Sequence, residues 1–471
     1  MVVIDEGGAV PPRILRALRR QARPRLRDWR AIVSRRLLDT VERHKSGEAL
    51  GIYSVCSAHP LVIEASVLRA LDDDGYLLVE ATSNQVDQFG GYTGMKPQDF
   101  RRLVLGLARR HGLPEDRIVL GGDHLGPNRW QERPAEEALA YAGDLVASYV
   151  AAGFTKLHLD CSMPCADDTS PLDDKVVAKR AARLANKAEQ EASARSQAPA
   201  DDLVYVVGTE VPVPGGAHEA LERLTPTSAD AARTTLAAHE AAFYAEGLEG
   251  AWNRVIALVV QPGVEFDLER VVDYDRSATG ELRRVLDDRG RLVFEAHSTD
   301  YQTRANLRDL VEDHWAVLKV GPALTFAMRE ALFALAAIED ELVAEGQRSE
   351  LLSVVEHRMQ EEPGYWEGYY PGDPATKRLL RRYSYSDRIR YYWSYPDVED
   401  ARKRLFSNLA AREIPQTLLS QYLPRQYERM RQGRLAGDPE ALVFDRIRET
   451  LQDYVVACKP KGEEARIWAD I

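Results

Sequence analysis

The sequence sets an acidic residue beside a histidine where a short apolar run ends. Ile118–Gly122 form the run, and Asp123 and His124 follow it directly. A carboxylate can transfer protons, and an imidazole is the commonest protein ligand of a metal ion. Such a pair also suits a simpler role, in which the aspartate caps a turn and the histidine bonds to backbone. The catalytic interpretation gains weight because the pattern recurs along the chain.

Histidines stand at the ends of three predicted strands, although the chain contains only ten. Three imidazoles, or two with a carboxylate, suit Zn²⁺ or another divalent metal and leave positions open for substrate oxygens. We therefore predict His124, His158 and His297 as metal ligands. Glu210 is the predicted carboxylate ligand, with Glu265 as its alternative. For His158, a packed position in the core explains the strand pattern equally well.

Other polar residues at predicted strand ends complete a site for a small polar molecule. We predict Asp123 and Asp160 as the residues that transfer protons. The predicted substrate-binding residues are Ser57, Asn84, Gln85, Lys156, Glu265, Asp300 and Lys319. Lys156 and Lys319 also suit Schiff-base catalysis, which solves the same electronic problem as a metal, or a buried ion pair. The histidines favour the metal.

The elements that position these residues alternate between strand and helix after residue 50. Eight short apolar or β-branched runs lack strict alternation, as expected for strands buried on both faces of a parallel sheet. They are Gly51–Cys56, Tyr76–Thr82, Ile118–Gly122, Phe154–Asp160, Leu203–Thr209, Arg254–Gln261, Leu292–His297 and Ala316–Val320. Amphipathic stretches at 97–111 and 135–152 are typical of the crossover helices between such strands.

This alternation predicts an α/β fold, a (β/α)8 TIM barrel, whose strand ends converge on one face where catalysis occurs. An open doubly wound sheet would need a glycine-rich phosphate turn after its first strand, and Ser54–Ser57 is no such turn. We predict an N-terminal helical extension over residues 1–48 and a barrel over 49–336. A mainly helical C-terminal region over 337–471 would pack on the barrel.

Two groups of residues offer a place for a phosphate. Backbone amides around Gly215-Gly216 or Gly321, together with Lys319, could hold it near the end of the eighth strand. Arg388 and Arg390 could hold it from the C-terminal region. The simpler alternatives are tight turns for the glycines and ion pairs on a helix surface for the arginines.

Composition excludes several classes of protein. The formal net charge of −12 gives no support for nucleic-acid binding, and no apolar run approaches the length of a membrane span. The four cysteines form no CxxC pair, so we predict a reduced, cytoplasmic setting. The arginine-rich stretch 13–36 could imitate a transit peptide. We favour a basic surface helix or extension, because Pro12 and Pro24 interrupt any single long helix.

Long motifs resemble the family of tagatose-bisphosphate aldolase "non-catalytic" subunits. They are Gly51–Glu64, Glu80–Met95, Gly121–Asn128, Lys156–Asp160, Ala166–Asp168, Gly208–Pro212, Glu295–Asp300 and Tyr383–Trp393. The resemblance implies a (β/α)8 barrel related to class II, zinc-dependent ketose-bisphosphate aldolases. By similarity to these aldolases, Asp123 would transfer protons and His124 would bind the metal.

The resemblance implies one of two functions. The first is a metal-dependent 4-epimerase of tagatose, fructose or their 6-phosphates, acting by retro-aldol and aldol steps. The second is a non-catalytic subunit that stabilises a separate class II tagatose-1,6-bisphosphate aldolase. An Asp–His pair beside further histidines favours the enzyme, because a purely structural subunit has no need of them. We expect a ketohexose or its phosphate as ligand, and a homo-oligomer or an aldolase subunit as partner.

Overall fold

Eight parallel strands close into a barrel in the computed structural model, which describes residues 26–73, 75–196, 202–209 and 224–460. Their order around the barrel is β1-β10-β9-β6-β5-β4-β3-β2. The strands are β1 (Ile52–Val55), β2 (Leu77–Thr82), β3 (Ile118–Leu125), β4 (Lys156–Leu159), β5 (Val204–Gly208), β6 (Val255–Val259), β9 (Val293–Ala296) and β10 (Trp315–Val320). The predicted TIM barrel and its eight strands are confirmed, with strand ends that shift by a few residues.

Helix α2 (Leu26–Lys45) closes the end of the barrel where the strands begin. Its Leu37 and Val41 belong to the same buried cluster as strand side chains such as Leu78 and Val204. The strands are buried on both faces, which explains why their sequences are apolar without strict alternation. This end of the barrel is therefore packed, and access is left to the opposite end.

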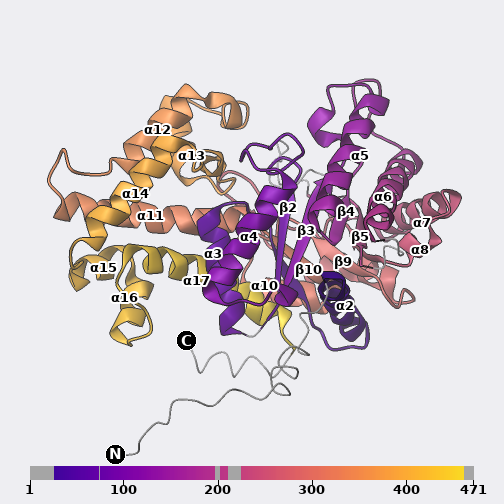
Figure 1. Cartoon of the computed structure of the whole chain (residues 1–471), viewed down its shortest axis with the longest axis horizontal. Helices are drawn as coiled ribbons and strands as arrows, with labels where there is room; N and C mark the ends of the chain where they lie inside the picture. Colours follow the sequence, from indigo (N-terminus) through magenta and orange to yellow (C-terminus); the bar gives the residue numbers. More distant parts are fainter. Residues whose placement is uncertain (1–25, 74, 197–201, 210–223, 461–471) are drawn as a thin grey trace, which may run out of the picture.

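Helices surround the barrel (Figure 1). They are α3 (Pro60–Asp72), α4 (Pro97–His111), α5 (Ala135–Ala152), α6 (Asp174–Ser196), α7 (Ala229–Ala245), α8 (Glu249–Trp252), α9 (Gly280–Arg283), α10 (Arg304–Glu312) and α11 (Pro322–Leu342). After β6 a small antiparallel pair, β7 (Glu265–Phe266) and β8 (Val271–Val272), precedes α9. No helix of the described residues is long and apolar enough to cross a membrane.

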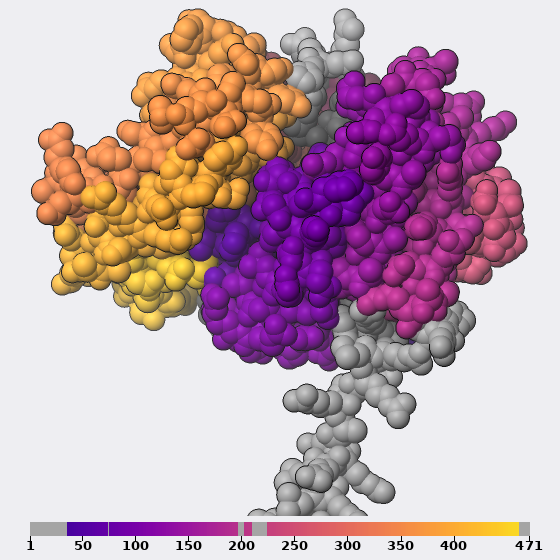
Figure 2. All heavy atoms as spheres, turned by 45° about the horizontal axis from the view of Figure 1, so that its top comes forward, coloured from indigo at the N-terminus to yellow at the C-terminus, as the bar shows by residue number. Residues whose placement is uncertain are grey.

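The region after α11 is mainly helical, as predicted, and lies beside the barrel (orange to yellow in Figure 1). Its helices are α12 (Leu351–Glu361), α13 (Pro374–Tyr383), α14 (Pro396–Ala410), α15 (Gln416–Tyr422), α16 (Pro424–Arg431) and α17 (Pro439–Cys458). Helix α17 packs against α3, α10 and α11. The two parts meet along a long seam (Figure 2). The division at residue 336, which falls within α11, stays a prediction.

Candidate active site

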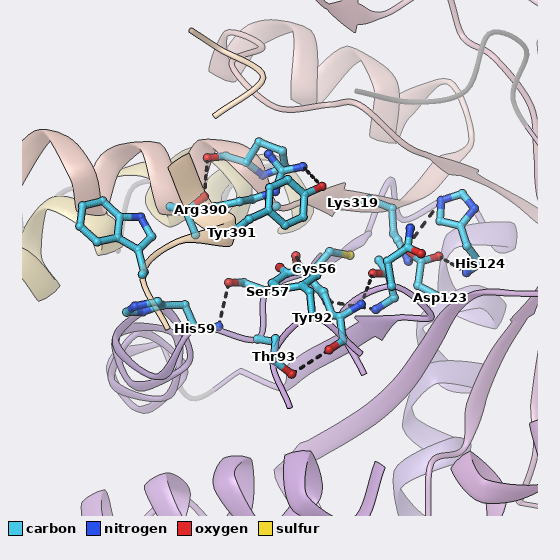
Figure 3. Close-up of a pocket in the computed structure, with 18 of the residues that line it drawn as sticks. Cys56, Ser57, His59, Tyr92, Thr93, Asp123, His124, Lys319, Arg390 and Tyr391 are labelled. Atoms are coloured by element: carbon cyan, nitrogen blue, oxygen red, sulfur yellow. Dashed lines mark hydrogen bonds and ion pairs between the residues drawn. The ribbon is translucent and has the colours of Figure 1, made fainter. Parts of the chain in front are cut away.

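A cavity of about 550 Å³ is lined by residues from the carboxyl ends of the strands and from the C-terminal region (Figure 3). The predicted site residues that line it are Ser57, Asn84, Gln85, Asp123, His124, Asp160, His297, Asp300 and Lys319. His158, Lys156 and Glu265 are buried and do not line it. Glu210 lies outside the described residues. The barrel thus gathers most of the predicted residues around one space.

A bulge in β3 turns Asp123 and His124 toward the same cavity. Successive side chains of a regular strand point to opposite faces of the sheet. Here the pairing of β3 with β4 shifts register between Gly122 and Leu125, and His124 takes a φ of +48°. Such bulges re-aim side chains beside active sites, and a histidine with positive φ marks local strain. The Asp–His pair is therefore placed by an irregularity of the strand.

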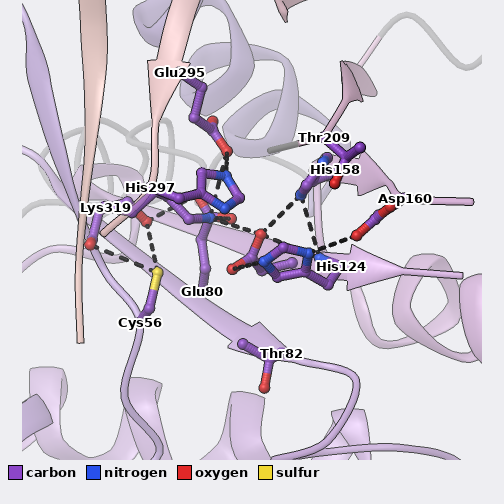
Figure 4. Close-up of polar contacts among 12 residues, drawn as sticks. Cys56, Glu80, Thr82, His124, His158, Asp160, Thr209, Glu295, His297 and Lys319 are labelled. Carbon is purple, nitrogen blue, oxygen red and sulfur yellow. Dashed lines mark hydrogen bonds and ion pairs between the residues drawn. The ribbon is translucent and has the colours of Figure 1, made fainter. Parts of the chain in front are cut away.

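Three histidine rings converge at this point. The ring centroids of His124, His158 and His297 lie between 4.9 and 5.2 Å from one another. Each ring, together with Asp123, offers one possible ligand atom, and these atoms all lie within 4.8 Å of one another. Figure 4 shows the three rings beside the buried carboxylates that hold them. The structure brings together the three predicted histidines and adds the carboxylate of Asp123.

The far nitrogens of two of these rings are held by carboxylates. Nδ1 of His124 lies 2.8 Å from Oδ2 of Asp160, and Nε2 of His297 lies 3.1 Å from Oε1 of Glu295. Metal-binding histidines almost always donate their second N–H in this way, which fixes the ring and its tautomer. Asp160 is therefore placed to orient His124, a role different from the predicted proton transfer.

The third ring tests whether a cation fits. Nε2 of His158 lies 3.0 Å from the carbonyl oxygen of Gly208, to which it donates its proton. Its Nδ1 lies 2.9 Å from Oδ1 of Asp123. A ring nitrogen and a carboxylate oxygen this close need a proton or a cation between or beside them. Three imidazoles and a carboxylate form a donor set that suits Zn²⁺, so these residues fit a divalent metal.

The carboxylates stabilise positive charge at His124. Burial lowers the pKa of His124, but Asp123 and Asp160 outweigh it and raise the pKa to about 9. Burial raises the pKa of Asp160, but the hydrogen bond and charge of His124 outweigh it, so that the pKa falls below its usual value. Burial lowers the pKa of His297 to about 3, which keeps that ring neutral. The cluster thus combines a neutral imidazole with a point that attracts a cation.

Beside the histidines, two lysines and two glutamates form a closed set of ion pairs. The fully buried Lys156 lies 2.7 Å from Glu80 and 2.6 Å from Glu295. Nζ of Lys319 lies 2.6 Å from Glu80 and 2.9 Å from Asp123. Burial lowers the pKa of Lys319, but Asp123 and the other acidic groups hold it well above the usual value. A protonated amine is no nucleophile, so this geometry favours the ion-pair alternative over Schiff-base catalysis.

Two further predicted residues act on the backbone or on neighbours. Oδ1 of Asp300 accepts the backbone N–H groups of Gly321 and Ala323 at 2.9 and 2.8 Å, at the start of α11. Glu265 accepts a hydrogen bond from the Ser298 hydroxyl at 3.2 Å. Asp300 and Ser298 line the cavity, whereas Glu265 lies behind Ser298. Substrate contact by Asp300 and Glu265 stays a prediction.

The C-terminal region supplies a wall of the cavity that the motif analysis mostly missed. Arg390 and Tyr391 come from the short 3-10 helix η7 (Arg388–Tyr391), and Trp393 follows it. Tyr391 packs against Tyr92 from the loop after β2, with ring centroids 4.7 Å apart. Arg388 does not line the cavity, because its guanidinium donates to the carbonyl of Tyr365 at 2.7 Å. The aromatic and arginine-rich stretch around these residues was the available signal.

Comparisons with known proteins identify what the chain resembles. The family profile of D-tagatose-1,6-bisphosphate aldolase subunit GatZ/KbaZ-like proteins matches residues 37–459. The crystal structure of a probable tagatose 6 phosphate kinase from Sinorhizobium meliloti 1021 is 48% identical, covers 87% of this chain and 100% of that chain, and has a TM-score of 0.80. The structure of the YdjI aldolase from Escherichia coli K12 is 10% identical, covers 80% of this chain and 98% of its own, and has a TM-score of 0.40.

Proposed function

The chain belongs to the D-tagatose-1,6-bisphosphate aldolase subunit GatZ/KbaZ-like family, and we propose that it is a metal-dependent ketohexose 4-epimerase. The proposed substrates are tagatose, fructose or their 6-phosphates. The observation that carries the proposal is the convergence of three held histidines and Asp123 beside a cavity large enough for a sugar. The family description and that of the S. meliloti relative both name a phosphorylated tagatose, which supports this substrate class.

We assign the metal, with Zn²⁺ as the first choice, to His124, His158 and His297, with the predicted Glu210 as the carboxylate ligand. When bound, the cation would stabilise negative charge on the C2 and C3 oxygens of the sugar. The protein's own contribution is to fix the three rings through Asp160, Glu295 and the carbonyl of Gly208. The ion pairs of the barrel interior hold this arrangement from behind.

The proton transfer falls to Asp123 in this proposal. C4 of a 2-ketose is not adjacent to the carbonyl carbon, so removal of its C–H proton gives no stabilised product. Asp123 instead takes the proton of the C4 hydroxyl, whose electron pair forms a C4 carbonyl as the C3–C4 bond breaks. The electrons of that bond pass to C3 and C2. Rotation of the aldehyde and re-formation of the bond invert C4, and Asp123 returns the proton.

Asp123 is favoured over Asp160 for this step because of the partners of each carboxylate. Oδ1 of Asp123 is held by His158 and Lys319, which leaves Oδ2 at the edge of the histidine cluster. Asp160 is bound by His124 on one oxygen and by Ser162 on the other. A base must reach its proton within hydrogen-bond distance, and Asp123 has the less occupied oxygen.

Epimerase and aldolase activity differ by whether the aldehyde leaves before the bond re-forms. The wall of Tyr92, Tyr391 and Trp393 borders the same cavity and would hold the aldehyde fragment while it rotates. This wall supports an epimerase, because a retained fragment re-adds faster than it escapes. The second candidate, a non-catalytic aldolase subunit, is supported by the family description. A cytoplasmic location and a homo-oligomer also stay predictions.

One experiment separates the candidates. The metal content of the pure protein is measured, and the protein is incubated with D-tagatose, D-fructose and their 6-phosphates, with and without a chelator. Products are followed by NMR. A 4-epimerase contains metal and interconverts the tagatose and fructose forms until chelator is added. If the protein contains no metal and converts none of the sugars, the proposal of an enzyme is wrong. Release of a free three-carbon aldehyde would identify an aldolase.

A further inference from the structure

The usual phosphate site of a barrel, at the end of its eighth strand, is closed here by protein groups. The two backbone amides at the start of α11, those of Gly321 and Ala323, already bind the carboxylate of Asp300. The neighbouring cation, Lys319, lies within 3.5 Å of three carboxylates. An anion at this place would meet a carboxylate instead of open amides. The sequence-based phosphate site at Gly321 and Lys319 is therefore not supported.

Arg390 brings positive charge to the cavity from the C-terminal wall. Its Nη1 donates to the backbone carbonyls of Ser386 and Asp387, and its Nη2 donates to the hydroxyl of Tyr391 at 3.0 Å. All three acceptors are neutral. Within the described ranges, no carboxylate oxygen lies within 4.0 Å of this guanidinium. Its charge is therefore not neutralised by an ion pair.

The acids that interact with Arg390 through longer-range charge are engaged by other donors. Oδ2 of Asp387 accepts a hydrogen bond from Thr325 at 2.6 Å, and its Oδ1 lies 3.7 Å from Nε of Arg329. Asp300 binds the α11 amides. Burial raises the pKa values of both acids to about 6, which weakens their negative charge near that pH. Neither acid takes the place of an anionic ligand at Arg390.

The other basic side chains of this wall differ from Arg390. Arg402 lines the cavity too, but Glu399 binds its Nε and Nη2 at 2.8 and 2.7 Å, so the pair carries no net charge. Burial lowers the pKa of His59 to about 4, so this ring is neutral near pH 7. Among the described basic side chains of this wall, Arg390 alone therefore carries a charge without an ion pair.

We propose that Arg390 binds the single phosphate of a ketohexose 6-phosphate. The proposal rests on the proposed function, which places the C2 and C3 oxygens at the histidines. In Figure 3, Arg390 and Tyr391 enter from the C-terminal region on one side of Lys319 and Asp123, and His124 lies on the other. The C6 end of the sugar would then reach toward Arg390.

The same geometry discriminates between phosphorylated sugars. A 1,6-bisphosphate needs a second anion site besides Arg390. The usual barrel place for a phosphate, at the end of β10, is closed by Asp300. A 6-monophosphate meets one cation and no opposing carboxylate ligand. The site is therefore built for the monophosphate.

Calorimetric titration of the purified protein tests this proposal. D-fructose 6-phosphate, D-fructose, D-tagatose 1,6-bisphosphate and inorganic phosphate are titrated into the wild type and into Arg390→Met. We expect the wild type to prefer fructose 6-phosphate over fructose by about tenfold or more, because charge-assisted hydrogen bonds are the strong ones. Arg390→Met should bind fructose 6-phosphate about 10- to 100-fold more weakly and fructose as before. The bisphosphate should bind more weakly than the monophosphate.

Arg402→Met is the matched control, since it removes a guanidinium of the same wall that is already paired with Glu399. It should leave the preference for fructose 6-phosphate intact. Inorganic phosphate should displace fructose 6-phosphate from the wild type and from Arg402→Met. If Arg390→Met fails to fold, Arg390→Lys decides, because it keeps the charge and loses the planar fork. It should weaken binding of the phosphorylated sugar alone.

Several results would overturn the proposal. These are equal binding of fructose and fructose 6-phosphate by the wild type, an intact preference in Arg390→Met, tighter binding of the bisphosphate, and no displacement by phosphate. An equal change for both sugars in Arg390→Lys counts against it too. Failure of the proposed function looks different. In that case the phosphorylated sugar still binds through Arg390, but neither metal nor turnover is found.

Discussion

The barrel side and the helical side of the cavity use charge in opposite ways. On the barrel side the charged groups beside the histidines share partners: Lys319 touches three carboxylates, and Asp123 is held by a lysine and a histidine. On the helical side Arg390 has only neutral acceptors. Breaking one ion pair of this network leaves another buried charge without its partner, so a rearrangement costs much free energy. The barrel side thus suits fixed chemistry, and the helical side suits the choice of ligand.

The largest expected effect comes from removing a histidine of the barrel side. His124→Ala should lose the bound metal and lower turnover by at least about 1000-fold, because the charge that a metal stabilises is worth several kcal/mol. Metal content by mass spectrometry and turnover by NMR are the measurements. His111→Ala is the control, since that ring binds Glu64 on the outer face of the barrel. A His124→Ala protein that keeps its metal and rate contradicts the ligand assignment.

The next effect concerns stability and compares ion pairs on the two sides. Lys156→Met leaves the buried Glu80 and Glu295 to share Lys319 and should lower the free energy of unfolding by about 3–5 kcal/mol. Arg402→Met breaks a partly exposed pair with Glu399 and should cost less than about 1 kcal/mol. Denaturant unfolding measures both. Equal losses would show that the barrel network is no more interdependent than the helical wall.

A smaller effect is expected where a carboxylate orients a ligand. Asp160→Asn keeps the shape but weakens the acceptor for the N–H of His124. Loss of such a partner typically weakens metal affinity about 10- to 100-fold. Titration with a competing chelator measures this change, and Ser162→Ala, which removes only one hydrogen bond to Asp160, should change it less. Unchanged affinity in Asp160→Asn, with turnover lost, would return Asp160 to the role of proton-transfer residue.

The last prediction concerns the pH dependence of stability and a histidine at the end of the barrel opposite to the cavity. Nε2 of His44 on α2 lies 3.0 Å from Nδ1 of His314, and burial lowers the pKa of His44 to about 4. In the unfolded chain His44 binds a proton near pH 6.5, whereas in the folded chain it stays neutral down to about pH 4. The free energy of unfolding is therefore highest above pH 6.5 and falls between pH 6.5 and 4. We expect a loss of roughly 1–2 kcal/mol between pH 7 and pH 5, measured by urea unfolding. His44→Gln should flatten this dependence. A slope that persists in the variant assigns it to other groups.

The strands and the histidines were accessible from sequence because local patterns encode them. Short β-branched runs such as Val204–Gly208 predict strands from local sequence. The carboxyl ends of parallel strands in a barrel all lie on one face. His124, His158 and His297 could therefore be grouped before their distances were known. The bulge that aims both Asp123 and His124 at the cavity could not be foreseen, because alternation predicts opposite faces for neighbours.

The ion pairs and the helical wall depend on tertiary contacts that no local pattern specifies. Glu80 and Glu295 lie in two of the predicted strands, yet only the closed barrel shows that they share Lys156. Arg388 and Arg390 were equivalent candidates in the sequence. The turn of η7 buries the first against Tyr365 and gives the second to the cavity. Choosing between two arginines two residues apart needs the backbone.

The seating of α17 on the barrel has a consequence for how the chain reaches its fold. The backbone N–H of Gly51 donates to the carbonyl of Cys458 at 2.9 Å, and Lys459 contacts the carbonyl of Asp73, 386 residues away in sequence. Contacts between such distant segments form slowly, because the entropy of closing a long loop is lost before the contacts stabilise the fold. During synthesis, the apolar faces of α3 and α10 stay exposed until α17 has left the ribosome. A ribosome that pauses before residue 439 would hold a barrel with an uncovered flank, so translation speed near that position sets how long the nascent chain stays prone to aggregation.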